Sequence, residues 1–163
     1  MEKLLVCIMG NRNSGKSYTW NALFNEIVRT GRTERKLYFN ACEYVNVFLV
    51  SGSPEERNEY IGDLITVNSP RIVLCSAQYS EGVKDTFNYF LENGYSIYVH
   101  WLNPGYKDEN IQFYDNLGII SWLLSKRSTV SIRNGKKYRK RVREIRDYIY
   151  GWASSRKLIV NNC

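Results

Sequence analysis

Short apolar runs recur along the chain, and most of them are closed by a glycine, a proline or a polar turn. Runs that lack polar residues at alternate positions are typical of strands that are covered on both faces. From these runs we expect strands at residues 3–9, 36–40, 44–50, 71–76, 95–102 and 128–133.

Between these runs, apolar residues return at intervals of three and four, which is the spacing of one face of a helix. We expect helices at residues 16–30, 54–65, 81–93, 109–125 and 136–153, although Gly118 weakens the fourth. The first helix has a stripe formed by Trp20, Leu23, Phe24, Ile27 and Val28, and the last has one formed by Tyr138, Val142, Ile145, Ile149 and Trp152. Strands that alternate with helices predict one α/β domain over residues 1–163 with a mostly parallel central sheet.

The first apolar run leads directly into the segment GNRNSGKS at residues 10–17, which matches the pattern G-x-x-x-x-G-K-[ST]. Glycines at Gly10 and Gly15 allow backbone conformations that a Cβ disfavours, and they allow a ligand to come close. The N–H groups of such a loop form a nest for phosphate oxygens, and the following helix presents its positive end to the same anion. The alternative is a surface turn in which Ser14 or Ser17 caps the helix.

With a buried strand before the loop and an amphipathic helix after it, residues 4–30 resemble the start of a P-loop nucleoside triphosphate hydrolase or kinase domain. The resemblance implies a three-layer αβα fold that binds a nucleoside triphosphate with magnesium. It implies that Lys16 acts on the β- and γ-phosphates and that Ser17 is a magnesium ligand. ATP is expected, and GTP is less favoured because no N-K-x-D-like tetrapeptide follows a strand. The residues assigned to the nucleotide are Gly10, Asn11, Arg12, Asn13, Ser14, Gly15, Lys16, Ser17 and Tyr18.

Domains of this kind usually carry a second, acidic site at the end of a strand, which orders magnesium or activates water. No Asp or Glu directly follows the strands expected to end at residues 50, 76 and 102. Glu43 lies between two expected strands, and Asp115 begins a D-x-x-G sequence inside an expected helix. Either a serine, a glutamine or water completes the magnesium shell, or turnover is slow. Gln78 follows a strand and is the candidate for orienting water, although such a residue also serves simply as a turn former.

The formal net charge of +7 is concentrated towards the C-terminus. Residues 1–125 carry 11 Lys and Arg against 14 Asp and Glu, whereas residues 126–163 carry 12 against 2. We expect residues 126–157 to form a basic helical segment with one of three roles. The first role is a solvated surface, and the second is a surface that binds nucleic acid or another polyanion. The third is a lid from which Lys126 or Arg127 reaches the γ-phosphate. The residues expected to bind a polyanion are Lys136, Lys137, Lys140, Arg141 and Arg143.

The cysteines Cys7, Cys42, Cys75 and Cys163 form no C-x-x-C pair, so reduced thiols in a cytoplasmic protein are expected. No apolar stretch approaches the ~20 residues that a membrane span needs. His100, the only histidine, is expected to be hydrogen-bonded at a strand end rather than catalytic.

Two functions fit these features. The first is ATP–magnesium-dependent hydrolysis or phosphoryl transfer, in a small ATPase or kinase. The second is a nucleotide-binding adaptor or switch with little turnover, whose basic helix contacts nucleic acid or a partner protein.

Overall fold

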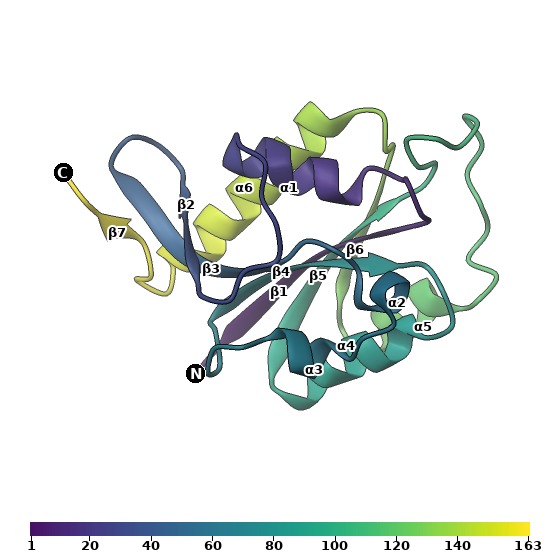
Figure 1. Cartoon of the computed structure of the whole chain (residues 1–163), viewed down its shortest axis with the longest axis horizontal. Helices are drawn as coiled ribbons and strands as arrows, with labels where there is room; N and C mark the ends of the chain where they lie inside the picture. The colour runs from purple at the N-terminus through teal and green to yellow at the C-terminus, as the bar shows by residue number, and fades with distance from the viewer.

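The computed structural model describes residues 1–163, and its centre is a seven-stranded sheet with helices on both faces (Figure 1). The strands are β1 (Lys3–Gly10), β2 (Arg35–Tyr38), β3 (Glu43–Val50), β4 (Ile72–Gln78), β5 (Tyr95–Leu102), β6 (Thr129–Arg133) and β7 (Val160–Asn161). The helices are α1 (Lys16–Phe24), α2 (Pro54–Arg57), α3 (Ile61–Leu64), α4 (Val83–Glu92), α5 (Ile119–Ser125) and α6 (Tyr138–Ser154). The expected α/β fold with a mostly parallel sheet is confirmed.

Strand β1 lies in the interior of the sheet, because the strand order is β2-β3-β4-β1-β5-β6. The neighbours from β3 to β6 pair in parallel, whereas β2 and β7 each pair antiparallel with β3. The carboxyl ends of the parallel strands therefore meet at one edge, which we call the carboxyl edge. In open α/β sheets this edge is where ligands bind.

Two apolar cores form because alternate side chains of each buried strand point to opposite faces. In β1, Leu5 and Cys7 join the core under α3, α4 and α5, while Val6 and Ile8 join the core under α1 and α6. Figure 1 shows α1 and α6 on one side of the sheet and α2 to α5 on the other. Burial on both faces explains why β1 reads as a continuous apolar run.

Three expected helices are shorter in the structure, and in each case a residue with positive φ interrupts them. Helix α1 is capped by Asn25 (φ 55°) instead of continuing to residue 30. The helix expected at 54–65 is divided by Asn58 (φ 52°), and the one expected at 109–125 begins only after Gly118 (φ 67°). Left-handed residues end helices, and apolar periodicity does not reveal them.

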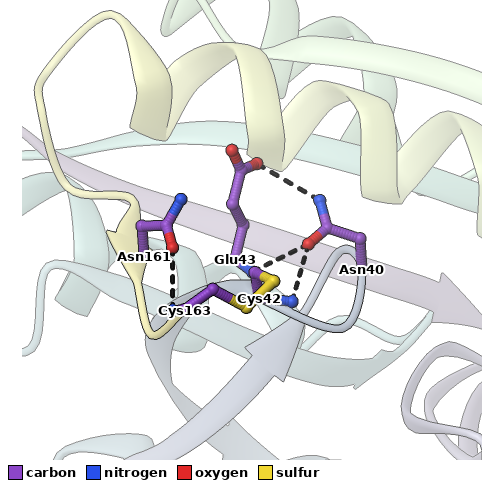
Figure 2. The surroundings of a disulfide bond; sticks show 5 residues. All are labelled: Asn40, Cys42, Glu43, Asn161 and Cys163. Atoms are coloured by element: carbon purple, nitrogen blue, oxygen red, sulfur yellow. Dashed lines mark hydrogen bonds between the residues drawn. A yellow bond between two sulfur atoms is a disulfide. The ribbon is translucent and has the colours of Figure 1, made fainter.

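A disulfide joins Cys42 to Cys163, so the expectation of reduced cysteines is wrong for this pair (Figure 2). The two residues lie 121 positions apart, and β7, which the sequence did not predict, brings their Cα atoms to 5.2 Å by pairing with β3. The side chain of Asn40 accepts the N–H groups of Cys42 and Glu43 and holds the turn before β3 (Figure 2).

The other two cysteines, Cys7 and Cys75, are free and buried, as expected. Because disulfides persist mainly in oxidising environments, the Cys42–Cys163 bond removes the reason for expecting a cytoplasmic, reducing compartment. No helix combines the length and the apolar composition that crossing a membrane requires.

Candidate functional site

Residues 10–17, the glycine loop, connect the end of β1 to the first turn of α1 at the carboxyl edge. Asn13 (φ 61°) and Gly15 (φ 105°) adopt left-handed backbone conformations. A Cβ at Gly15 would come within 3.1 Å of the Arg141 guanidinium, so both conformation and space favour glycine there.

Several donors of the glycine loop have no partner within the chain. The backbone N–H groups of Asn13, Gly15, Lys16 and Ser17 reach no acceptor. The hydroxyl of Ser14 is also unpaired, although this residue is only 2% exposed. Unpaired N–H groups at a helix start, together with the helix dipole, attract phosphate and other anions.

Lys16 is the buried cation of the site, with 6% of its side chain exposed. Its ammonium group donates to the carbonyl oxygens of Gly10 (3.1 Å) and Asn11 (2.8 Å) and to Oε1 of Glu56 (3.0 Å). Three acceptors satisfy the three N–H bonds of the ammonium group. Glu56 is the one of the three that is carried by a side chain and not by the backbone, and it is partly exposed.

Glu56 is a carboxylate at the site that the sequence analysis did not identify. It lies on α2, six residues after the end of β3, so it was missed by a search directly after each strand. Helix α2 follows the carboxyl end of β3, and this position brings the carboxylate of Glu56 to the ammonium of Lys16, although the two residues are 40 positions apart in the sequence.

The hydroxyl of Ser17 and the carboxylate of Glu56 are the oxygen donors beside the glycine loop that suit magnesium. Ser17 is exposed, and its hydroxyl lies 3.5 Å from the carbonyl oxygen of Ser51 at the end of β3. No group of three or more His, Cys, Asp or Glu side chains is placed so that it could hold a metal ion, here or elsewhere in the structure. A magnesium ion would therefore depend on water and on the phosphates of the ligand for its other positions, as is usual for this ion.

The glycine loop forms one wall of a pocket of about 580 Å³, a volume within the usual range for small-molecule sites. The opposite wall comes from the loops after β5 and β6 and from the start of α6. The pocket is lined by Arg12, Asn13, Ser14, Gly15, Lys16, Ser17, Tyr18, Glu56, Tyr106, Lys107, Gly135, Lys136 and Tyr138. Seven of the nine residues that the sequence analysis assigned to the nucleotide line this pocket. The two that do not line it are Gly10 and Asn11.

Arg141 is buried behind the pocket and braces the glycine loop. Its guanidinium donates to the hydroxyl of Thr19 (2.9 Å) and to the carbonyl oxygens of Asn134 (3.2 Å) and Gly135 (3.1 Å). Burial lowers the pKa of Arg141 to about 10, so it stays charged at neutral pH. Since it is only 1% exposed, Arg141 does not lie on the solvent-facing surface where the sequence placed it as a polyanion ligand.

Gln78 lies at the carboxyl end of β4, directly beside Gly10 in the sheet register. Its backbone N–H donates to Glu55 (2.6 Å), whose carboxylate also accepts the hydroxyl of Thr86 (2.5 Å). Burial raises the pKa of Glu55. Gln78 lines a separate pocket of about 480 Å³ with Glu55 and Thr86, and it does not line the pocket of the glycine loop.

The expected lid residues are far from the glycine loop. Lys126 and Arg127 precede β6, which runs parallel to β5, so they lie at the edge opposite the carboxyl edge. The five residues of β6, at about 3.3 Å each, separate them from the site. Asp115 is also accounted for, because its carboxylate accepts the N–H groups of Ile119 and Ile120 and thus caps α5.

The remaining basic residues stay near the pocket. Lys136 lines it, and Lys137, Lys140 and Arg143 are exposed on the first turns of α6 or just before them. The sequence analysis missed Tyr106, Lys107, Gly135 and Tyr138, which reach the pocket from loops and turns without a motif.

No protein-family model matches the chain, and no curated protein and no solved structure matches it either.

Proposed function

We propose that this chain is a three-layer αβα protein of the P-loop type that binds a nucleoside triphosphate with magnesium and hydrolyses or transfers its γ-phosphoryl group. The observation that carries the proposal is the set of unpaired backbone N–H groups in the glycine loop and at the start of α1, together with the buried ammonium of Lys16. A surface turn that merely caps a helix would need neither the buried lysine nor a pocket of this volume.

In this proposal the phosphate chain lies on the N–H groups of Asn13 and of residues 15–17, and its charge replaces Glu56 as a partner of Lys16. Lys16 keeps its bonds to the carbonyl groups of Gly10 and Asn11, which fix the ammonium against the phosphates. Positioned cations of this kind stabilise the charge that develops during phosphoryl transfer. Glu56, once released, faces the pocket as the carboxylate that polarises an attacking water or hydroxyl group. Bound magnesium would neutralise phosphate oxygens, and the hydroxyl of Ser17 is the protein group that would hold it, with water in its other positions.

Nucleotide binding is tested by titrating magnesium–ATP and magnesium–GTP into the protein and into the Lys16→Ala variant. Removing a hydrogen bond to a charged group costs about 1.5–3 kcal/mol, so we expect the affinity to fall by about 10- to 100-fold. Lys157→Ala is the matched control, because Lys157 is exposed beyond the other end of α6. Equal affinity of the wild type and Lys16→Ala would show that the assigned site is wrong.

Turnover is tested separately with Glu56→Gln, which keeps the shape of the side chain and removes its charge. We expect this variant to bind the nucleotide at least as tightly as the wild type, because the competing carboxylate is gone. Phosphate release or acceptor phosphorylation should fall by about 100-fold or more, as is typical when a general base is lost.

The second candidate function, a nucleotide-binding switch with little turnover, is favoured by the absence of Asp or Glu at the carboxyl ends of β3, β4 and β5. Tight nucleotide binding without measurable turnover in the wild type would select this candidate.

A further inference from the structure

Exposed cations lie at the pocket and on the adjoining first turns of α6, and they come from three different parts of the chain. We call them the basic rim, and it consists of Arg12, Lys107, Lys136, Lys137, Arg139, Lys140 and Arg143. All seven are exposed, and Arg12, Lys107 and Lys136 line the pocket itself. Residues 136–143 contain no acidic residue that could neutralise them.

Most of the basic rim has no partner within the chain. Other basic residues near α6 have one: Arg133 pairs with Glu144 at 2.7 Å, and Arg146 donates to the carbonyl oxygens of Leu23 and Tyr38. The structure gives no hydrogen bond or ion pair to the side chains of Arg12, Lys107, Lys137, Lys140 and Arg143. The charges of these residues are thus not used to hold the fold together.

The position of these cations on α6 is electrostatically unfavourable without an anion. The N-terminus of a helix carries a positive partial charge, which favours acidic side chains in the first turn. The first turn of α6 contains no acidic residue, and its N-cap, Lys137, makes no capping bond with its side chain. The opposite face of α6 is buried with Val142, Ile145 and Ile149 in the core, so it is not free to lie on a membrane.

Three tyrosines lie among these cations at the pocket. Tyr18 and Tyr106 are 54% and 58% exposed, which is high for rings of this size. The ring of Tyr138 meets that of Tyr18 edge-on, with the centroids 4.9 Å apart. Aromatic faces beside cations are the combination with which proteins bind single-stranded nucleic acid, because bases stack on the rings and phosphates meet the cations.

We propose that the basic rim and the tyrosines Tyr18, Tyr106 and Tyr138 form a binding surface for single-stranded nucleic acid. The phosphates follow the cations at the start of α6, and the bases stack on the tyrosines at the pocket mouth. The inference goes beyond the proposed triphosphate site, since it concerns a second ligand and uses side chains other than Lys16.

The test is fluorescence anisotropy with a labelled oligothymidylate of about 20 nucleotides, without added nucleotide, over a series of salt concentrations. We expect binding at about 50 mM salt that weakens linearly on a logarithmic scale as salt rises. Lys137→Gln/Lys140→Gln should reduce the salt slope by about 1.4, which is about 0.7 for each lost phosphate contact, and the affinity by roughly tenfold. Tyr106→Ala should reduce the affinity by about fivefold or more, with little change in the salt slope.

The matched control is Lys36→Gln/Lys157→Gln, which removes the same charge from exposed positions away from the rim. Lys157 lies beyond the C-terminal end of the 17-residue α6, about 25 Å from its start. We expect this control to keep most of the wild-type affinity. An equal loss in the control and the rim variant would overturn the inference, as would the absence of binding at low salt. Equal affinity for a duplex of the same length would overturn the assignment to single strands.

Lys16→Ala separates the two proposals, because it should lose the nucleotide and still bind the oligonucleotide. Circular dichroism and thermal unfolding show whether each variant remains folded. If a folded rim variant binds the oligonucleotide as tightly as the wild type, the inference fails while the triphosphate site stands.

Discussion

His100 shows how a single buried side chain can link the fold to pH. It lies on β5 with no exposed surface, and its Nε2 is 2.7 Å from the hydroxyl of Tyr98. This confirms the expectation of a hydrogen-bonded histidine in a strand. Burial, and after it the charge of Arg133, lowers the pKa of His100 from 6.5 to about 4, while Glu144 opposes the shift. The folded protein therefore holds this histidine neutral at neutral pH.

We expect His100 to make the protein less stable as the pH falls from about 6.5 towards 4. In that interval the unfolded chain binds a proton at this histidine and the folded protein does not, so the free energy of unfolding decreases with falling pH. Between pH 7 and pH 5 the contribution is about 2 kcal/mol. Urea unfolding of the wild type and of His100→Gln at both pH values measures it, because glutamine keeps an acceptor for Tyr98 and does not titrate.

Only the difference between the two proteins counts in this measurement, since Glu55 and the other carboxylates titrate in both. If the wild type and His100→Gln lose the same free energy of unfolding between pH 7 and pH 5, the histidine is not held neutral.

At the scale of elements, the loops after β5 and β6 hold the glycine loop from outside. The N–H of Tyr106 donates to the carbonyl of Ser14 (2.9 Å), and the N–H of Gly135 donates to that of Pro104 (2.7 Å). The three loops meet so closely that a Cβ at Gly135 would lie 2.5 Å from the Ser14 oxygen and 2.6 Å from the Tyr106 nitrogen. No flexible side chain can move away to make room there, because these are backbone atoms.

We therefore expect Gly135→Ala to destabilise the protein by about 1–3 kcal/mol, the usual range for overpacking, and to weaken nucleotide binding. The matched control is Gly82→Ala, where no atom lies within 4 Å of the added Cβ and φ is −70°. The control should unfold within about 0.5 kcal/mol of the wild type. Thermal unfolding and ATP titration of both variants check this, and wild-type behaviour of Gly135→Ala would contradict the close contact of the three loops.

The elements also show which features of the fold were accessible from the sequence. The strands β1, β3, β4 and β5 were predicted to within about two residues at each end, because strands buried on both faces appear as continuous apolar runs. The C-terminal end of α1 and the start of α5 were not predicted, because they depend on the positive φ of Asn25 and Gly118 and on the cap by Asp115. These boundaries are set by single backbone conformations and a local cap, which apolar spacing does not reveal.

The site residues also divide into those that the sequence predicted and those that it did not. The glycine loop was predicted because its residues are consecutive and each has a role that a local motif defines. Glu56, Tyr106 and Gly135 were missed because they reach the loop only through the order of the strands, which residue spacing does not specify. Lys126 and Arg127 were placed at the wrong edge for the same reason, since the direction of β6 decides their position.

On the scale of the whole molecule, the basic residues between 136 and 143 are brought together beside the glycine loop, although they are far from it in the sequence. Strand β6 ends at the carboxyl edge, and α6 starts there with its basic turns beside the glycine loop. The C-terminal end of α6 leads instead to β7 and the disulfide at the far side of the sheet (Figure 1). Helix α6 thus connects the proposed binding surfaces at its start to the Cys42–Cys163 disulfide, which is the covalent closure of the chain.

That closure is the basis of a last prediction, which concerns the stability of the entire domain. The Cys42–Cys163 bond spans 121 residues, so it restricts most of the unfolded chain. In the chain-entropy account a loop of this size stabilises the folded state by about 5 kcal/mol, whereas measured values for disulfides are typically lower, about 2–4 kcal/mol. We expect Cys42→Ser/Cys163→Ser to lose about that amount in urea unfolding, and the wild type to lose the same amount when a reductant is added.

Two controls make the result specific to this bond. The double serine variant should not respond to the reductant, because its remaining cysteines, Cys7 and Cys75, are free thiols and leave no disulfide to reduce. Its affinity for ATP should equal that of the wild type under conditions where both are folded, since Arg141 braces the glycine loop from the other end of α6. A wild type that unfolds at the same urea concentration with and without reductant would show that the tail after α6 adds no covalent stability.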